Sequence, residues 1–338
     1  MAKISFFELE DWEEEKLRQA FPNDELFFSR ERLTTDNLPS DLETSVICIF
    51  TDSRIDSLIL DRLPNVKLVT TRSTGYDHID QKQCQSRGVS VAYVPGYGDN
   101  TVAEYTFGLM LNLTRKIYLA LDRVKETGSF DLTGLRGMDL KGKTLGVVGT
   151  GRIGKEVIKV AKGFSMNVLA FVPHPDETLA KDLGFSYVGL SQLLSTCDIV
   201  TLHCPLTAET HHLINRDNIV NFKKGSFLIN TARGGLVDTE ALWWALDQKI
   251  LAGAALDVLE EEGEIKDEMN FISHGHPNPE VLKKMVENHL LMKMSNVLIS
   301  PHNAFNSKEA LERILQMTIE NISGFLKNKP VNLVSHDH

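Results

Sequence analysis

A glycine-rich segment near the middle of the chain has the residue types and spacing of a loop that binds a dinucleotide. An apolar run at residues 144–148 leads into Gly149, Gly151 and Gly154, and an amphipathic stretch follows at residues 155–164. In a strand–turn–helix unit the first glycine permits a sharp turn, the second permits close approach to a pyrophosphate, and the third permits tight packing of the helix on the strand. The first N–H groups of the helix then point at the phosphate charge. Glycines also mark ordinary turns, but the flanking strand and helix patterns together favour a nucleotide-binding site.

Three further groups have the residue types required for hydride transfer to or from a small carboxylic acid. This chemistry needs a cation for the carboxylate, a proton donor for the carbonyl oxygen, and a group that keeps this donor charged. Arg233 and His302 each follow an apolar run, and three glutamates stand at residues 260–262. Open α/β sheets bind ligands at the carboxyl ends of their strands, which is where both residues are expected. Each group has a structural alternative: an ion pair for Arg233, a turn cap for His302 and a solvated face for the glutamates.

The remaining histidines do not require a metal site. His274, His276 and residues 335–338 form histidine-rich segments that could ligate a metal. Histidines of loops and tails are, however, mostly solvated. A nicotinamide mechanism needs no metal, so we expect none. We expect His211 and His212 to lie on the surface.

The elements that must position these residues follow an alternating pattern of strands and helices. In the first hundred residues, runs rich in β-branched residues predict strands at 4–7, 46–51, 67–70 and 89–94, with helices at 11–19 and 56–61. Beyond the run at 144–148, a second series predicts strands at 167–172, 198–202, 226–230, 252–257 and 297–300. Strands separated by helices indicate βαβ units and parallel sheets. The sequence therefore predicts an α/β protein with two doubly wound halves.

Three other segments complete the expected architecture. Apolar residues recur at helical spacing over residues 102–127, which predicts one long buried helix capped by Asn100 or Thr101. Residues 128–143 are dotted with glycine and charge and predict an exposed arm. A C-terminal helix at residues 307–327 needs a sheet to cover, and the first half of the chain offers one.

Length, charge and cysteine spacing limit the class of protein further. At 338 residues the chain is longer than one hydrophobic core usually serves, so we expect two domains. The net charge of −10 argues against nucleic acid or an anionic membrane as a partner. We expect no secretory signal, and no apolar run reaches the roughly 18 residues of a membrane span. Four scattered cysteines without CxxC spacing indicate free thiols and a cytoplasmic protein.

Seven segments occur in an order that is far more specific than any one of them. They read RSTGYDHID at 72–80, VPGYGDNTVAE at 94–104, GTGRIG at 149–154, LHCPLT at 202–207, NTARGG at 230–235, LDV at 256–258 and PHNAF at 301–305. Together they resemble the D-isomer-specific 2-hydroxyacid dehydrogenase family, and they look closest to its D-lactate dehydrogenase branch. The resemblance implies a flavodoxin-like substrate domain at residues 1–101 and 303–338 and a Rossmann NAD(P)-binding domain at 102–302. It also implies a homodimer, with the long helix and the arm as the contact.

The resemblance implies catalytic roles for the residues that match the motifs. Arg233 would hold the substrate carboxylate, and His302 would be the acid/base that serves the carbonyl oxygen. Glu262, five residues beyond the aspartate of the LDV segment, would pair with His302 and favour its protonated form. Glu260 and Glu261 are alternatives for this role, because the three glutamates stand in a row. The planar guanidinium of an arginine suits a carboxylate better than an ammonium does.

For the cofactor, the resemblance implies contacts from the glycine loop and from the ends of later strands. The implied residues are Gly149, Gly151, Arg152, Ile153, Gly154, Val172, His203, Cys204, Pro205, Thr231, Ala232 and Asp257. Among them, Asp257 would accept a hydrogen bond from the nicotinamide carboxamide. His203 and Cys204 would approach the ring through their backbone rather than act as a base and a nucleophile.

For the substrate, the resemblance implies residues from both halves of the chain. Thr74 and Gly75 would present backbone N–H groups to the carboxylate, and Tyr97 would line the site. Phe50 and Phe305 would form an apolar wall that limits the side chain of the 2-oxo acid. Core packing explains both phenylalanines about equally well.

The sequence departs from the family pattern at the end of the second strand of the cofactor unit. An acidic residue there hydrogen-bonds the adenosine ribose of NAD, and its charge repels the 2′-phosphate of NADP. This chain has Val172 instead, followed by Pro173 and His174. Without the carboxylate and without a neighbouring arginine, we expect NAD as the cofactor with weakened discrimination, and NADP is an alternative.

The sequence therefore predicts reversible hydride transfer between NAD(P)H and pyruvate or a similar small 2-oxo acid, with the D-2-hydroxy acid as the reduced product. One alternative is a sibling enzyme that reduces glyoxylate, hydroxypyruvate or a branched 2-oxo acid. A second is a non-catalytic scaffold that keeps the fold and senses the redox state of the nicotinamide pool. The intact set of Arg233, Glu262 and His302 favours an enzyme over the scaffold.

Overall fold

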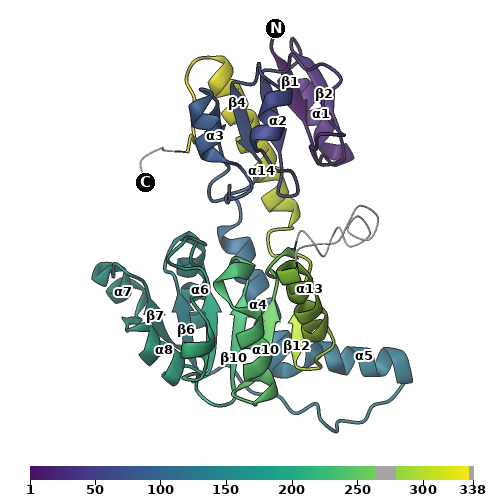
Figure 1. The fold of residues 1–338 in the computed structure, drawn as a ribbon. Coiled ribbons are helices and arrows are strands. Elements are labelled where there is room, and N and C mark those ends of the chain that lie inside the picture. The colour runs from purple at the N-terminus through teal and green to yellow at the C-terminus, as the bar shows by residue number, and fades with distance from the viewer. Residues whose placement is uncertain (263–278, 335–338) are drawn as a thin grey trace. The chain divides into compact units, whose positions relative to one another are not determined.

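The computed structural model describes residues 1–262 and 279–334, and the chain divides into two compact units (Figure 1). The first unit comprises Met1–Tyr97 and Ser307–His338, and the second comprises Gly98–Asn306. The sequence places these divisions at residues 101/102 and 302/303. Each unit has its own parallel sheet, and hydrophobic residues are buried on both faces of each sheet.

The first unit is built on a parallel sheet of five strands. The strands are β1 (Lys3–Phe6), β2 (Glu25–Phe28), β3 (Val46–Ile49), β4 (Leu68–Thr71) and β5 (Ser90–Ala92). Their order across the sheet is β2-β1-β3-β4-β5. This is the flavodoxin-like order, so the fold expected for this part of the chain is confirmed. The edge strand β2 is at most half-buried and lacks a regular alternation of buried and exposed residues, so the sequence did not predict it.

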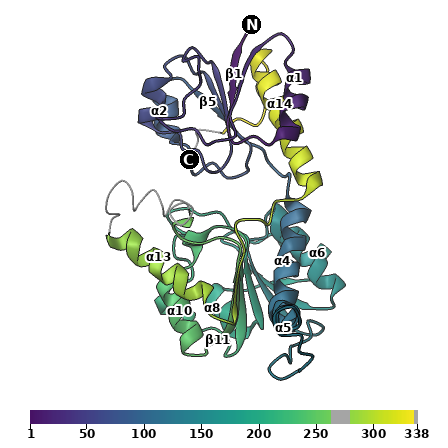
Figure 2. The same cartoon turned by 90° about the vertical axis from the view of Figure 1, so that its right-hand side faces the viewer.

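Helices cover both faces of this sheet, as Figure 2 shows. They are α1 (Asp11–Ala20), α2 (Ser57–Arg62), α3 (Gln81–Ser86) and α14 (Lys308–Leu326). α1 and α14 pack with Val46 and Cys48, whereas α2 and α3 pack with Ile47 and Ile49. Successive residues of β3 thus face opposite sides, as a pleated strand requires. The C-terminal helix α14 covers the sheet of the first unit, as predicted.

The second unit is built on a parallel sheet of seven strands. The strands are β6 (Thr144–Val148), β7 (Asn167–Phe171), β8 (Ser186–Tyr187), β9 (Ile199–Leu202), β10 (Ser226–Asn230), β11 (Leu251–Leu256) and β12 (Val297–Ile299). Their order is β12-β11-β10-β9-β6-β7-β8. This is the Rossmann order with β12 added at one edge, and the strand order reverses between β6 and β9. The Rossmann fold expected for this unit is confirmed.

Helices also cover both faces of the seven-stranded sheet (Figure 2). They are α4 (Asp99–Arg115), α6 (Arg152–Gly163), α7 (Glu177–Leu183), α8 (Leu190–Thr196), α9 (Arg216–Ile219), α10 (Thr239–Asp247) and α13 (Pro279–Met292). α4, α6 and α7 pack with Leu145 and Val147 on one face. α8, α9, α10 and α13 pack with Val148 and Leu228 on the other face.

The helix expected at residues 102–127 is instead two helices, α4 and α5 (Ile117–Thr127). Lys116 between them has a φ of 53°, a left-handed conformation in which a helix cannot continue. The exposed arm contacts the chain at this point, because the N–H of Met138 donates to the carbonyl oxygen of Thr114 at 2.9 Å. The expectation of one continuous helix is therefore wrong. The break coincides with the contact of Met138, which lies well beyond this segment in the sequence.

The start and the burial of this segment also differ from the expectation. The N-cap residue of α4 is Gly98 rather than Asn100 or Thr101. All of α5 is at least partly exposed, with Tyr118 and Leu121 at 55% and 63%. The apolar spacing in α5 therefore marks a surface face and not a buried one.

Candidate active site

The glycine loop joins β6 to α6 in a sharp turn. Gly149 has a φ of +97°, and an added Cβ would lie 2.6 Å from the carbonyl oxygen of His203. An added Cβ at Gly154 would lie 2.0 Å from the carbonyl oxygen of Gly149, so glycine is needed for α6 to lie this close to the strand. A Cβ at Gly151 would meet no heavy atom of the described residues within 4 Å. The chain itself does not demand glycine at this position, and the space fits a bound phosphate.

The N-terminus of α6 offers donors to such a phosphate. Its N-cap residue is Gly151, and among the described residues no side chain caps the first turn. The first N–H groups of a helix have no partner within the helix, so they and the positive dipole end can receive an anion. Arg152 is exposed there, with its Nε 2.8 Å from Oδ2 of Asp99, and Ile153 packs into the core beneath. The loop and the helix end together fit the pyrophosphate of a dinucleotide.

Val172 adjoins this loop at the position where dinucleotide-binding units carry an acidic residue. β7 ends at Phe171, whose carbonyl oxygen accepts the N–H of Gly149 at 2.9 Å. Val172 is half-buried, and His174 is exposed. A hydrocarbon side chain neither accepts hydrogen bonds from ribose hydroxyls nor repels a phosphate. Val172, where this chain departs from the family pattern, therefore lies beside the glycine loop that fits the dinucleotide.

His203 and Cys204 follow β9 and are poorly suited to acid–base or nucleophilic chemistry. Burial lowers the pKa of His203 to about 3, and its Nε2 lies 2.9 Å from Oγ1 of Thr201. Burial raises the pKa of the Cys204 thiol to about 11. The imidazole is therefore neutral and the thiol protonated near neutral pH. The backbone of this segment adjoins Gly149, and Pro205 continues it at the surface.

Three neighbouring strands bring the remaining candidate residues of the second unit to one edge of its sheet. Arg233, Asp257 and His302 follow β10, β11 and β12, whose last residues are paired in register. Neighbouring strands lie about 4.8 Å apart, so the backbones that lead to Arg233 and His302 are about 10 Å apart at this edge. It is the carboxyl edge, where open α/β sheets bind their ligands.

His302 is hydrogen-bonded to Glu262 and not to Glu260 or Glu261. Its Nδ1 lies 2.6 Å from Oε1 of Glu262. The backbone of His302 is left-handed, with a φ of 51°, and its N–H donates to the carbonyl oxygen of Asp257 at 2.8 Å. This conformation is uncommon for residues other than glycine and recurs at functional sites. The turn cap considered for His302 therefore does not describe its side chain, which is directed at a carboxylate.

A hollow of about 530 Å³ borders this pair. Besides His302 and Glu262, its lining includes Ser300 and Tyr118. The ring of Phe305 packs edge-on to the imidazole, with the two centroids 6.3 Å apart. Apolar walls with a few convergent polar groups are typical of sites for small molecules.

Asp257 is 1% exposed and holds the segment that carries His302. Its carboxylate accepts hydrogen bonds from Ser300 Oγ at 2.5 Å, from Asn303 N at 2.8 Å and from Ala304 N at 2.7 Å. Burial raises the pKa of Asp257, and these donors oppose the rise. A carboxylate can accept about four hydrogen bonds, so the chain's own donors use most of this capacity.

The loop that carries Arg233 is fixed by a buried asparagine that sequence reasoning missed. Asn230, 1% exposed, accepts the N–H of Ala232 at 3.0 Å and donates to the carbonyl oxygen of Arg233 at 2.8 Å. Oγ1 of Thr231 lies 2.9 Å from that of Thr106 in α4. Arg233 is half-buried, and its Nη1 donates to the carbonyl oxygen of Ala232 at 2.8 Å. The NTARGG motif itself contained the signal, because an asparagine at a strand end commonly bonds the turn that follows.

In the first unit, Phe50 follows β3 and is held by charged residues that the sequence did not single out. Its N–H donates to Oε2 of Glu8 at 2.9 Å, and the guanidinium of Arg72 lies 5.1 Å from the centre of its ring. Arg72 is 3% exposed and bonds Oε1 of Glu13 at 2.5 Å. Phe50 and Phe305 are each half-buried.

The other candidate substrate residues of the first unit lie on loops at the carboxyl edge of its sheet. Thr74 and Gly75 follow β4, and Oγ1 of Thr74 donates to the carbonyl oxygen of Val94 at 2.8 Å. Thr74 is exposed, and Gly75 is half-buried. Tyr97 is half-buried, and its carbonyl oxygen accepts a hydrogen bond from Nε of Arg313 at 2.7 Å.

Comparison with known proteins places the chain in a family. Residues 107–304 match the model of the D-isomer-specific 2-hydroxyacid dehydrogenase NAD-binding domain. A 2-hydroxyacid dehydrogenase homolog of Zymomonas mobilis is 39% identical over 312 residues, which cover 91% of each chain. This chain belongs to the D-isomer-specific 2-hydroxyacid dehydrogenase family.

Two other relatives show the range of activities named among the similar 2-hydroxyacid dehydrogenases. A glyoxylate reductase of Thermofilum pendens is 39% identical over 317 residues, which cover 91% of this chain and 85% of the relative. The crystal structure of a D-lactate dehydrogenase from Aquifex aeolicus, complexed with NAD and lactic acid, is 33% identical. Its TM-score is 0.86, and the match covers 96% of both chains. The family resemblance inferred from the sequence motifs is therefore confirmed.

The expectation that both adjacent histidines lie on the surface holds for His211, whereas His212 is only partly exposed. His211 is exposed, but His212 is half-buried, and its Nε2 lies 2.6 Å from Oε1 of Glu260. The three residues bring possible metal ligands within 4.8 Å of one another. Oε2 of Glu260, however, accepts a hydrogen bond from Thr239 Oγ1 at 2.6 Å and lies 3.1 Å from Nζ of Lys284. A cation of the chain already balances this carboxylate, so we assign the cluster a structural role.

The histidine-rich segments, with His274, His276 and residues 335–338, lie outside the described residues. Over the described ranges 1–262 and 279–334, no helix is both long enough and apolar enough to cross a membrane.

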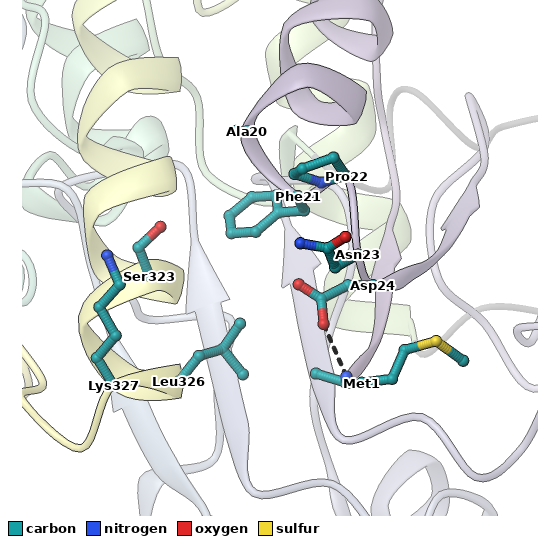
Figure 3. A pocket seen from close by; sticks show the side chains of 10 residues that line it. Met1, Ala20, Phe21, Pro22, Asn23, Asp24, Ser323, Leu326 and Lys327 are labelled. Atoms are coloured by element: carbon teal, nitrogen blue, oxygen red, sulfur yellow. Dashed lines mark hydrogen bonds between the residues drawn. The ribbon is translucent and has the colours of Figure 1, made fainter.

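A second pocket, of about 490 Å³, lies in the first unit (Figure 3). It is bordered by the start of β1, by the turn between α1 and β2, and by Lys327 at the end of α14. There Oδ1 of Asp24 accepts the N–H of Ala2 at 2.8 Å. Because Ala2 and Asp24 precede β1 and β2, this pocket lies at the amino edge of the sheet, whereas ligands bind at the carboxyl edge. We therefore assign it no part in the chemistry.

Proposed function

We propose that this protein reversibly reduces a small 2-oxo acid to the D-2-hydroxy acid with NAD(H). Pyruvate is the substrate that we expect it to prefer. The observation that carries this proposal is the pair of His302 and Glu262, which lies at the same sheet edge as Arg233. The glycine loop of the same unit fits a dinucleotide. The nicotinamide, when bound, supplies the hydride for reduction and takes it up in oxidation.

The three charged residues divide the remaining work. Arg233 binds the substrate carboxylate through its planar guanidinium. His302 donates a proton to the carbonyl oxygen during reduction and accepts it back during oxidation. Because Nδ1 of His302 bonds Glu262, the transferred proton resides on Nε2. Glu262 stabilises the protonated ring by its negative charge.

The contacts to cofactor and substrate follow the family pattern. We assign the cofactor to the glycine loop, Val172, His203–Pro205, Thr231, Ala232 and Asp257. We assign recognition of the substrate to Thr74, Gly75, Tyr97, Phe50 and Phe305, the two phenylalanines limiting the size of its side chain. Support comes from the placement of these residues at the carboxyl edges of their own sheets.

A steady-state survey of four 2-oxo acids with both reduced cofactors tests the activity. The acids are pyruvate, glyoxylate, hydroxypyruvate and 2-oxoisocaproate, and we expect the highest kcat/KM for pyruvate with NADH. A higher value for glyoxylate or hydroxypyruvate would assign the chain to the sibling reductases, one of which is named among its relatives. NADH binding without turnover of any of the four acids would overturn the enzymatic proposal in favour of a scaffold.

Val172→Asp is expected to raise the NADH-over-NADPH ratio of kcat/KM by at least about 10-fold. The introduced carboxylate accepts hydrogen bonds from the ribose hydroxyls, and such charged bonds contribute about 1.5–3 kcal/mol each. It also repels the 2′-phosphate of NADPH. Val172→Asn is the control, because it restores polarity without the charge. An equal loss with both cofactors would show that this position does not contact the ribose.

We further propose a homodimer and a cytoplasmic location. The exposed side of α5 and the arm after it carry Tyr118, Leu121, Phe130 and Leu132, of which Phe130 and Leu132 are 85% and 79% exposed. Exposed large apolar side chains that gather on one surface are typical of protein interfaces, and we propose that these four form one. Sedimentation equilibrium distinguishes a dimer from a monomer. The four cysteines are free thiols, which suits a reducing compartment.

A further inference from the structure

The side chain of Glu260, two residues before Glu262, is bonded to several different segments of the second unit. Its side chain is 9% exposed. Oε1 bonds Nε2 of His212 at 2.6 Å, and Oε2 accepts the N–H and the Oγ1–H of Thr239 at 2.9 and 2.6 Å. Lys284 of α13 lies 3.1 Å from Oε2, and Asn288 donates to the carbonyl oxygen of Glu260 at 2.9 Å. Burial alone would raise the pKa of Glu260, but the hydrogen bonds of His212 and Thr239 and the charge of Lys284 outweigh it and lower this pKa.

The same residue contacts the loop that carries Arg233. An added Cβ at Gly234 would lie 2.0 Å from the carbonyl carbon of Leu259 and 2.4 Å from the nitrogen of Glu260. The two backbones are therefore packed against each other directly after Arg233. His212 extends this contact, because its N–H donates to the carbonyl oxygen of Gly235 at 2.8 Å while its ring bonds Glu260.

Glu260 also begins the turn that presents Glu262 to His302. Glu261 in the middle of this turn is left-handed, with a φ of 52°. The N–H of Leu259 donates to Oε2 of Glu262 at 3.3 Å, and Oε1 of Glu262 bonds His302. A shift of the Glu260 backbone therefore moves Glu262 on one side and the Arg233 loop on the other.

We propose that Glu260, with His212 as its partner, is a positioning residue that holds the Arg233 loop in register with the Glu262–His302 pair. The inference rests on the proposed function, because it assumes that one substrate meets the guanidinium and the imidazole together. Misplacement of a reacting group by about 1 Å costs about 100-fold in rate. Among the described residues, the hydrogen bonds and ion pairs of Glu260 are with His212, Thr239, Lys284 and Asn288. Its proposed action is therefore through the segments that carry Arg233 and Glu262.

Glu260→Ala tests this inference, with Glu261→Gln as the matched control on the exposed neighbour. For Glu260→Ala we expect KM for pyruvate to rise and kcat to fall, each about 10-fold, because both loops lose their common anchor. The Kd for NADH, measured by fluorescence titration, stays within about 2-fold, since the glycine loop is untouched. Glu260→Gln keeps an oxygen for Thr239 but loses the charge that attracts Lys284, so its effect is intermediate. Glu261→Gln leaves KM and kcat within about 2-fold.

The outcomes separate positioning from a merely structural role. If the Glu260 variants melt earlier but keep both KM and kcat, or change only one of the two, the inference is wrong. If Glu260→Ala does not fold, the same criteria are applied to Glu260→Gln and His212→Asn. Asparagine is chosen at position 212 because it tolerates the left-handed backbone there. Arg233→Ala and His302→Ala, measured beside them, report on the proposed function. If the proposed function is wrong, turnover is undiminished in those two variants, whatever the result for the Glu260 variants.

Discussion

Replacement of His302 by alanine is expected to lower kcat for pyruvate reduction by at least about 10³-fold while NADH still binds. A positioned general acid contributes about 10²–10⁴-fold, and reduction leaves an alkoxide that must be protonated. The ring sits at the end of β12, apart from the glycine loop after β6, so its loss leaves the fitted cofactor contacts in place. Steady-state kinetics give kcat, and the quench of NADH fluorescence gives cofactor binding.

The pair with Glu262 supplies the control for this result. Glu262→Gln keeps the size of the side chain and a hydrogen bond to Nδ1 of His302, but it removes the charge that stabilises the protonated ring. We expect a fall in kcat of about 10-fold, smaller than that of the alanine variant. Turnover that survives in His302→Ala would place the proton donor elsewhere and remove the basis of the proposed mechanism.

The parts of this site that the sequence predicted are those set by local pattern. The spacing of Gly149, Gly151 and Gly154 defines a turn within six residues, and a strand before it and a helix after it complete the unit. Arg233 and His302 follow apolar runs that predict strands of a parallel sheet, whose carboxyl ends share one edge. Local rules therefore placed both residues correctly without any knowledge of the contacts between them.

The parts that the sequence did not predict depend on residues far apart along the chain. The residues near Lys116 do not predict a helix break, because lysine is a good helix former. The contact that accompanies the break comes from Met138 in the arm. Among the three adjacent glutamates, composition alone cannot distinguish Glu262, which faces His302, from Glu260, which faces His212. Local reasoning is blind to such partners, since the pairing is decided by tertiary packing.

Arg72→Met is expected to lower the free energy of unfolding of the first unit by about 3–5 kcal/mol. Arg72 is 3% exposed, and its guanidinium bonds Glu13 Oε1 at 2.5 Å, the carbonyl oxygen of Phe7 at 3.0 Å and that of Glu8. Removing one partner of a buried ion pair leaves the other charge without compensation, which costs about this much. Urea unfolding measures the loss, with separate transitions fitted for the two units.

Two further variants show whether the uncompensated charge is the cause. Glu14→Gln breaks the exposed pair with Arg18 on the same helix α1, and we expect less than about 1 kcal/mol because solvent already screens it. The double variant Arg72→Met/Glu13→Leu removes both buried charges, so it should recover most of the stability that Arg72→Met loses. A double variant no more stable than the single one would show that packing around Phe50, over which the guanidinium lies at 5.1 Å, carries the effect instead. In that case the loss would also appear as a weaker preference for small 2-oxo acids, since Phe50 would no longer be held in place.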